Sequence, residues 1–178
     1  MVNFISAAGL LALVPLVVVA APAGTDANVE VRAAESVPFS FAKWADDIIA
    51  NPDGQHPSPE EALALAFNQT STDGLEKRQA DVHCEFNKPG DSASVADAVW
   101  CIDFIAQRAN VQCKAIVSAT SFCRRGQAQI TGDTSSPCGN VARSAGAIMD
   151  ACTRNGLVYG QNKAWGNGNM VVHIRSPY

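Results

Sequence analysis

Two histidines and one carboxylate in the C-terminal part of the chain have the residue types of a general acid/base site. His83 and Glu85 fall on one face of an alternating segment at residues 80–87, and His173 falls in a second alternating segment near the C-terminus. Together with a cationic clamp, such groups form the set of catalytic residues that small secreted ribonucleases use. The arginines available for the clamp are Arg124, Arg125 and Arg175. Because no local motif fixes their geometry, the sequence favours the alternative, two solvent-facing strand histidines among unrelated charges.

All six cysteines lie after Arg78, which predicts a disulfide-crosslinked C-terminal domain. They are Cys84, Cys101, Cys113, Cys123, Cys138 and Cys152. The sequence does not choose among their pairings, but it excludes one. Cys138 and Cys152 would lie about 21 Å apart along one helix that rises about 1.5 Å per residue, beyond the reach of a disulfide. The chain has no CxxC pair, so neither a metal site nor another cofactor is expected.

The dibasic pair Lys77-Arg78 stands between two segments of different composition. Residues 21–78 contain no cysteine and have ten acidic against four basic residues, a net charge of −6. Residues 79–178 have nine basic and seven acidic residues, a net charge of +2. Two adjacent cations in a polar stretch suit the acidic subsites of a kexin-type protease. The sequence therefore predicts cleavage after Arg78, with residues 79–178 as the mature domain.

The first twenty residues predict a signal peptide. Residues 1–20 form a nearly uncharged apolar run that ends in small residues, and Pro15 interrupts this run. The pattern indicates cleavage near Ala20 or Ala21 and an extracellular, secreted protein without a stable membrane span. Asn68 begins the chain's one N-x-S/T motif and is the candidate for an N-linked glycan.

Residues 21–78 are predicted to form an acidic pro-segment with two short helices. Apolar residues recur at helical spacing in residues 37–50, and a Ser-Pro-Glu-Glu start signal opens a second helix at residues 58–67. The apolar surface of these helices is too small for them to fold alone. Two alternatives remain: the helices cover an apolar patch on the following domain, or the pro-segment is largely flexible.

Several segments after Arg78 have the patterns of β-strands. The alternation at residues 80–87 predicts a strand, and residues 122–131 predict one or two strands that Gly126 bends or breaks. The C-terminal part predicts a hairpin, with residues 157–159 leading out and residues 170–174 leading back.

Two longer helices are predicted between these strands. The first lies within residues 89–110, and the second starts near Cys138 and ends in Asn155-Gly156 as a C-cap. Strand, helix, strands, helix and hairpin in this order predict an α+β fold. We expect a two-layer sandwich in which two helices cover one face of a four- to five-stranded, mainly antiparallel sheet stapled by disulfides.

The tip of the last hairpin carries Trp165 among turn-forming residues at 161–169. A tryptophan exposed there would be a recognition element, for example for a wall polymer or another glycan, and the alternative is that it folds back onto the sheet. The basic residues of the mature domain are interspersed with acids, which predicts a mixed solvated surface and no nucleic-acid partner.

The segment SSPCGNVARSAGAIMDACTRNGLVYGQNKAWGNGNMVVHIR has one cysteine that starts a helix, a second that ends it, and a Gly-Asn-rich hairpin. In this pattern the chain resembles fungal small secreted cysteine-rich proteins of the killer-toxin-like and necrosis-inducing effector-like kinds. The resemblance implies a disulfide-stapled α/β sandwich, release by a kexin-type protease, and a virulence or toxin role. It carries over no catalytic residues.

The sequence as a whole therefore favours a secreted, non-enzymatic toxin- or effector-like protein. Its target would lie on a host or competitor cell, and the sequence does not identify that target. Two alternatives stay open. One is a small secreted hydrolase or ribonuclease that uses His83, Glu85 and His173, and the other is a wall- or glycan-binding module.

Overall fold

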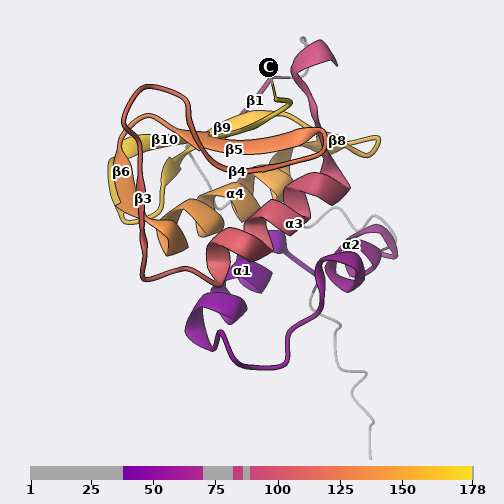
Figure 1. Cartoon of the computed structure of the whole chain (residues 1–178). Coiled ribbons are helices and arrows are strands. Elements are labelled where there is room, and N and C mark those ends of the chain that lie inside the picture. Colours follow the sequence, from indigo (N-terminus) through magenta and orange to yellow (C-terminus); the bar gives the residue numbers. More distant parts are fainter. Residues whose placement is uncertain (1–37, 70–81, 86–88, 178) are drawn as a thin grey trace, which may run out of the picture. The chain divides into compact units, whose positions relative to one another are not determined.

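A five-stranded antiparallel sheet forms one layer of the fold (Figure 1). The structure is a computed structural model that describes residues 38–69, 82–85 and 89–177. The strand order across the sheet is β1-β9-β10-β5-β4, and each neighbouring pair is antiparallel. The strands are β1 (His83–Cys84), β4 (Thr120–Arg125), β5 (Ala128–Gly132), β9 (Gly160–Ala164) and β10 (Asn167–Arg175). The expected sheet is confirmed.

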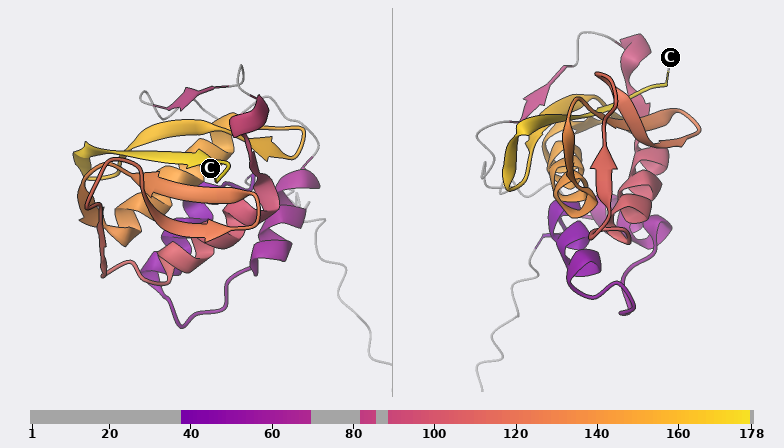
Figure 2. Two further views of the ribbon diagram at one scale, coloured as in Figure 1. Left: turned by 45° about the horizontal axis from the view of Figure 1, so that its top comes forward. Right: turned by 60° about the vertical axis from the view of Figure 1, so that its left-hand side comes forward.

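Two helices, α3 (Val95–Ala106) and α4 (Cys138–Cys152), cover one face of this sheet (Figure 2). Ile130, Val172 and Ile174 are fully buried in the hydrophobic core. The side chain of Ser94 caps α3 by accepting a hydrogen bond from the amide nitrogen of Asp97 at 3.4 Å. The α+β fold with two helices on one face of the sheet is therefore confirmed.

The turn between β4 and β5 requires a glycine. Gly126 has a φ of 45°, and a Cβ atom there would lie 2.5 Å from Oδ2 of Asp97. The same carboxylate accepts a hydrogen bond from the amide of Gln127 at 2.9 Å. The first turn of α3 thus holds the hairpin in place, and the predicted break at Gly126 is confirmed.

Two smaller sheets complete the strand pairing of the described residues. Their orders are β2-β8-β7 and β3-β6. The strands are β2 (Ala93–Ser94), β3 (Gln112–Lys114), β6 (Ser135–Pro137), β7 (Thr153–Arg154) and β8 (Leu157–Val158), and a 3-10 turn, η1 (Pro89–Asp91), precedes β2.

Asn155-Gly156 is a hairpin turn and does not cap α4, so that prediction was wrong. The helix ends at Cys152, and Thr153 already has an extended backbone with a ψ of 126°. Asn155 and Gly156 have φ values of 51° and 76°. Positive φ at two successive residues is what a two-residue hairpin turn of type I′ requires. The dipeptide therefore connects β7 to β8 after the helix has ended.

The last hairpin also differs from the prediction. Residues 157–158 form β8 and pair with β2 and β7, whereas the outgoing strand of the hairpin is β9. Residues 161–164, predicted as part of a loose tip, belong to that strand. Gln161 and Lys163 give no clear hydrophobic alternation, but β1 and β10 pair with β9 on both sides, and this tertiary pairing overrides the weak local preference.

Helices α1 (Phe41–Ala50) and α2 (Pro59–Phe67) pack on the side of α3 and α4 that faces away from the sheet (Figures 1 and 2). α1 contacts both α4 and α3, and α2 contacts α3. A capping box of Ser58 and Glu61 starts α2. Of the two arrangements that the sequence left open, these helices adopt the one in which they cover the following domain. None of the helices in the described ranges is long and apolar enough to cross a membrane.

Three disulfides crosslink the helices to the strands. They are Cys84–Cys152, Cys101–Cys123 and Cys113–Cys138. The excluded bond between Cys138 and Cys152 is absent, because each of these residues joins a strand instead. Closing loops of 22 to 68 residues by such bonds stabilises a fold by roughly 3–4 kcal/mol per bond in chain-entropy terms.

Replacing Cys84 and Cys152 together by serine is expected to lower the free energy of unfolding by about 2–5 kcal/mol. The reason is that β1 pairs with β9 at only two positions, so the disulfide is the main link between β1 and the end of α4. Guanidinium denaturation measures the loss. A non-reducing peptide map of the variant should retain the other two bonds, and a different pairing in the wild-type map would contradict the structure.

Candidate functional site

The structure describes the predicted glycan site but not the predicted processing site. Lys77 and Arg78 lie outside the described residues, as does the predicted signal peptide. Asn68 is described: it is exposed and forms the C-cap of α2, where its amide nitrogen donates to Ala64 O at 2.9 Å. Its side chain is therefore accessible to modification, and glycosylation of Asn68 stays a prediction.

Trp165 lies in the tight turn between β9 and β10, and its side chain is 55% exposed. The turn is anchored to α4 by the buried Ser144. The Ser144 hydroxyl accepts from the amide of Trp165 and donates to the carbonyl of Lys163, both at 2.8 Å. Trp165 is thus presented on a fixed turn, and its role in recognition stays a prediction.

The two histidines of the predicted acid/base set lie on one face of the sheet. His83 pairs with Gln161, and Gln161 pairs in turn with His173. Directly opposite residues of antiparallel strands point to the same side. Because Val172 and Ile174 are in the core, His173 and the two residues aligned with it point to the outer face, away from α3 and α4. β9 lies between the two histidine strands, which do not pair directly.

This row of polar residues continues across the remaining two strands. His173 pairs with Thr131, and Thr131 pairs with Ser121. Thr131 is only 1% exposed, and its hydroxyl has no hydrogen-bond partner among the described residues. The row therefore places His173 directly opposite a buried threonine.

Burial and charged neighbours shift the pKa of His173. Burial lowers the pKa of His173, the positive charge of Arg175 lowers it further, and the negative charges of Asp133 and Glu85 act in the opposite direction. With a lowered pKa the imidazole is neutral at neutral pH and able to accept a proton. The structure thus brings His83, His173, Glu85 and Arg175 together on the outer face, whereas no group of three or more His, Cys, Asp or Glu in the described ranges is arranged to hold a metal ion.

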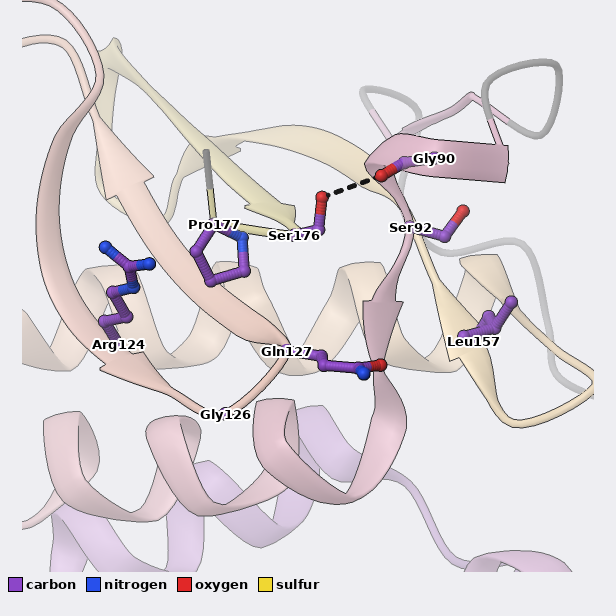
Figure 3. Close-up of a pocket in the computed structure, with 8 residues that line it drawn as sticks. All are labelled: Gly90, Ser92, Arg124, Gly126, Gln127, Leu157, Ser176 and Pro177. Carbon is purple, nitrogen blue, oxygen red and sulfur yellow. Dashed lines mark hydrogen bonds between the residues drawn. The ribbon is translucent and has the colours of Figure 1, made fainter.

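A pocket of about 470 Å³, whose lining includes no histidine, lies where the C-terminal residues meet η1 (Figure 3). Ser176 fixes one wall, because its hydroxyl donates to Gly90 O at 3.0 Å and its amide donates to Asp91 O at 2.7 Å. The lining residues are Gly90, Ser92, Arg124, Gly126, Gln127, Leu157, Ser176 and Pro177. Arg124 is the charged residue among them, so the pocket offers a cation and hydroxyl groups but no general base.

A polar contact with three hydrogen bonds joins α1 to α4. Asp150, in the last turn of α4, accepts hydrogen bonds from the hydroxyl of Ser40 at 2.7 Å, the amide of Phe41 at 2.7 Å and the amide of Ala42 at 3.1 Å. Free amide groups at the start of a helix attract an anion, and here the anion comes from the helix that α1 covers. Asp150 therefore fixes the position and direction of α1.

Two further residues of α4 contact α1 on the same face. Gly146 lies one turn before Asp150, and a Cβ atom there would be 2.7 Å from backbone atoms of Phe41 and Ala42. A glycine inside a helix costs about 0.5–1 kcal/mol relative to alanine, and this one allows two helix backbones to touch. One turn earlier, Arg143 forms an ion pair with Asp46. We call Arg143, Gly146 and Asp150 the α1 seat.

Sequence reasoning missed the α1 seat. Its three residues recur every three or four positions, which is the spacing of one helix face, but nothing local distinguishes them from an ordinary small-residue helix. The partners Ser40 and Asp150 are separated by 110 positions in the chain. The sequence did indicate the helix that binds to this seat, through the apolar spacing within residues 37–50.

Comparison with known proteins gives one match. A family model described as a domain of unknown function (DUF8794) matches residues 79–176, just over half of the chain. No curated protein and no solved structure matches. The matched range begins at the residue after Arg78 and contains the five-stranded sheet, α3, α4 and all six cysteines, whereas α1 and α2 lie outside it.

The seat predicts a pH dependence of precursor stability. Burial raises the pKa of Asp150 above its usual value near 3.8 and outweighs the opposing effect of its three hydrogen bonds. The contribution of Asp150 to stability is therefore full below about pH 3.8 and is lost as the pH rises through the raised pKa. Asp150→Asn removes this titration and keeps an oxygen acceptor.

At each pH we compare the melting temperatures of the variant and the wild type. We expect the difference, variant minus wild type, to be larger at pH 7 than at pH 4. Thermal unfolding of both precursors at the two pH values measures this difference. A difference that is the same at pH 4 and pH 7 would show that Asp150 does not titrate under α1.

Proposed function

The chain belongs to the DUF8794 family, and for this member we propose a secreted toxin- or effector-like function with release from a precursor by a kexin-type protease that cuts after Arg78. In this proposal the residues before the cut are a leader, and the disulfide-stapled domain is the active form. The domain acts by binding a target on a host or competitor cell and not by catalysis.

The observation that carries the proposal is that a segment outside the family domain covers one face of it. α1 buries Phe41, Trp44 and Ile48 against α3 and α4, and these side chains are 1–5% exposed. Burial of side chains of this size contributes about 1.5–3 kcal/mol each. A leader that did nothing but direct secretion would need no such contact, so the contact supports a precursor in which this face is kept covered.

The position of the basic pair supports the same proposal. Lys77-Arg78 falls between α2 and the first strand of the family domain, directly before the matched range. All three disulfides lie within residues 84–152, so cleavage after Arg78 leaves no covalent bond between the leader and the domain. A single cut would therefore suffice to separate them.

Changing Lys77 and Arg78 together to alanine tests this function. We expect the variant to be secreted with the leader attached and to lose cell-killing or growth-inhibiting activity, because the kexin-type subsites lose both cations. Intact mass spectrometry of the secreted protein reports the cleavage, and leaf infiltration and growth assays on competing fungi report the activity.

A control variant with Arg108 and Lys114 changed to alanine removes two exposed cations within the domain and should be cleaved and active like wild type. Full activity of an uncleaved Lys77/Arg78 variant would rule out the covering role of the leader. A secreted wild-type protein whose mass still includes residues 21–78 would rule out cleavage after Arg78.

A second candidate function is hydrolysis, for which the row of polar residues on the outer sheet face is the specific observation. Burial lowers the pKa of His173, the charges of Glu85 and Arg175 act on it, and His83 lies two strands away on the same face. Phosphodiester cleavage uses a base, an acid and a cation around the scissile phosphate, and these residue types share this face. This arrangement supports a small secreted ribonuclease or related hydrolase.

For this candidate, replacing His83 and His173 together by alanine is expected to abolish turnover of RNA, a loss of about 100-fold or more for a general acid/base pair. The assay uses the purified secreted protein and its double variant, with circular dichroism to show that both are folded. Turnover in the wild type no greater than in the double variant would eliminate the hydrolase and leave the binding function standing.

A further inference from the structure

α1 meets the domain in the way that helical ligands meet a groove. Its buried residues are Phe41, Trp44, Ala45 and Ile48, at positions i, i+3, i+4 and i+7. This spacing is the signature of an amphipathic helix that lays one face into an apolar groove. The indole nitrogen of Trp44 donates to the carbonyl of Pro57 at 2.9 Å, so its polar group is satisfied within the leader and its rings are free to fill the groove.

The α1 seat supplies selectivity in addition to this apolar contact. Gly146 admits a helix backbone at a distance that a side chain would prevent. Asp150 accepts hydrogen bonds from the free amides at the start of α1, and Arg143 forms an ion pair with an acidic residue one turn further along α1. A helix bound in the reverse direction would place its carbonyl end against the carboxylate of Asp150, which is repulsive. The groove therefore fits a helix with an acidic surface residue, bound in one direction.

We propose that the outer face of α3 and α4 is a helix-binding groove and that the leader, residues 38–69, is its reversible ligand after the chain is cut. The proposal rests on the cleavage proposed above and adds a second step to it. Cutting after Arg78 does not by itself uncover the domain; the leader leaves when the cut protein is diluted.

The physical basis is the loss of the covalent connection. In the uncut chain, the covalent connection gives the leader an effective concentration on the order of millimolar. After the cut, binding depends on the actual concentration of the two fragments. A contact built on two short helices, of ten and nine residues, belongs among small, transient interfaces, for which we expect a dissociation constant on the order of micromolar. The fragments would then stay together in a concentrated secretory vesicle and separate outside the cell.

The test uses the full secreted precursor, cut after Arg78 with a purified kexin-type protease. A precursor with a specific protease site in place of residues 72–78 yields equivalent fragments. Size-exclusion chromatography and native mass spectrometry then follow the fragments from about 50 µM down to about 50 nM, a range that brackets the expected constant. We expect co-migration at the high end, separation at the low end, and recovery of the complex on reconcentration.

Gly146→Ala tests the groove itself. The added methyl group meets the backbone of α1, while alanine favours the α4 helix, so the domain keeps its fold. We expect at least about 10-fold weaker binding of the leader fragment, the effect of about 1.4 kcal/mol. Gly168→Ala is the matched control, because a Cβ atom there contacts nothing within 4 Å, and it should bind the leader like wild type.

Two results would overturn the proposal. One is fragments that stay apart at 50 µM or together at 50 nM; the other is a Gly146→Ala fragment that binds the leader as tightly as wild type. The cut is made in vitro, so these results do not depend on processing in the cell. If the Lys77/Arg78 variant is fully active but the fragments behave as expected, the proposed function fails and the groove stands.

Discussion

The fold depends on α4 being held at both ends. Its first residue, Cys138, is bonded to β3, and its last, Cys152, is bonded to β1. Between these bonds the helix packs against α3, β9 and β10 on one side and against α1 on the other. A domain of about a hundred residues has a limited core, and crosslinks at both ends fix the helix on which both layers rest. The disulfides therefore do more than lower the entropy of the unfolded chain: they keep the seat residues in register with the sheet.

This constraint gives the domain two chemically different faces on opposite sides of the same core. The outer face of the sheet carries the polar row with His83 and His173, and the outer face of the helices carries the α1 seat. The two faces have different chemistry, because alternation along the strands separates polar from apolar residues, whereas α4 is buried nearly all around and exposes little polar surface. Covering the helical face leaves the sheet face open, so a leader bound there would block partner binding through the helices but not chemistry on the sheet.

The sequence predicted those parts of the structure that have a local pattern. α3, α4 and the β4–β5 hairpin follow from periodicity and from Gly126, and the exclusion of the Cys138–Cys152 bond follows from the rise of a helix. The predictions failed where tertiary pairing decides the outcome. Strand β9 has little apolar alternation and exists because two strands flank it, and Asn155-Gly156 suits a helix end as well as a hairpin. The α1 seat has no local signal, since Gly146 and Asp150 acquire their role only when a helix a hundred residues away is placed on them.

The leader and the domain have net charges of opposite sign, but their contacts indicate recognition by shape and direction. The ion pair of Arg143 with Asp46 is partly exposed, and pairs of this kind contribute about 0–1 kcal/mol. The three large buried side chains of α1 each contribute about 1.5–3 kcal/mol, so apolar burial outweighs the ion pair several times. Asp150 has a third role, because its hydrogen bonds to Phe41 and Ala42 are directional and its burial is costly unless a helix start is present. Apolar burial thus supplies the strength of the contact and Asp150 its orientation, so a short helix can cover the domain firmly while tethered and, after the proposed cut, leave it on dilution.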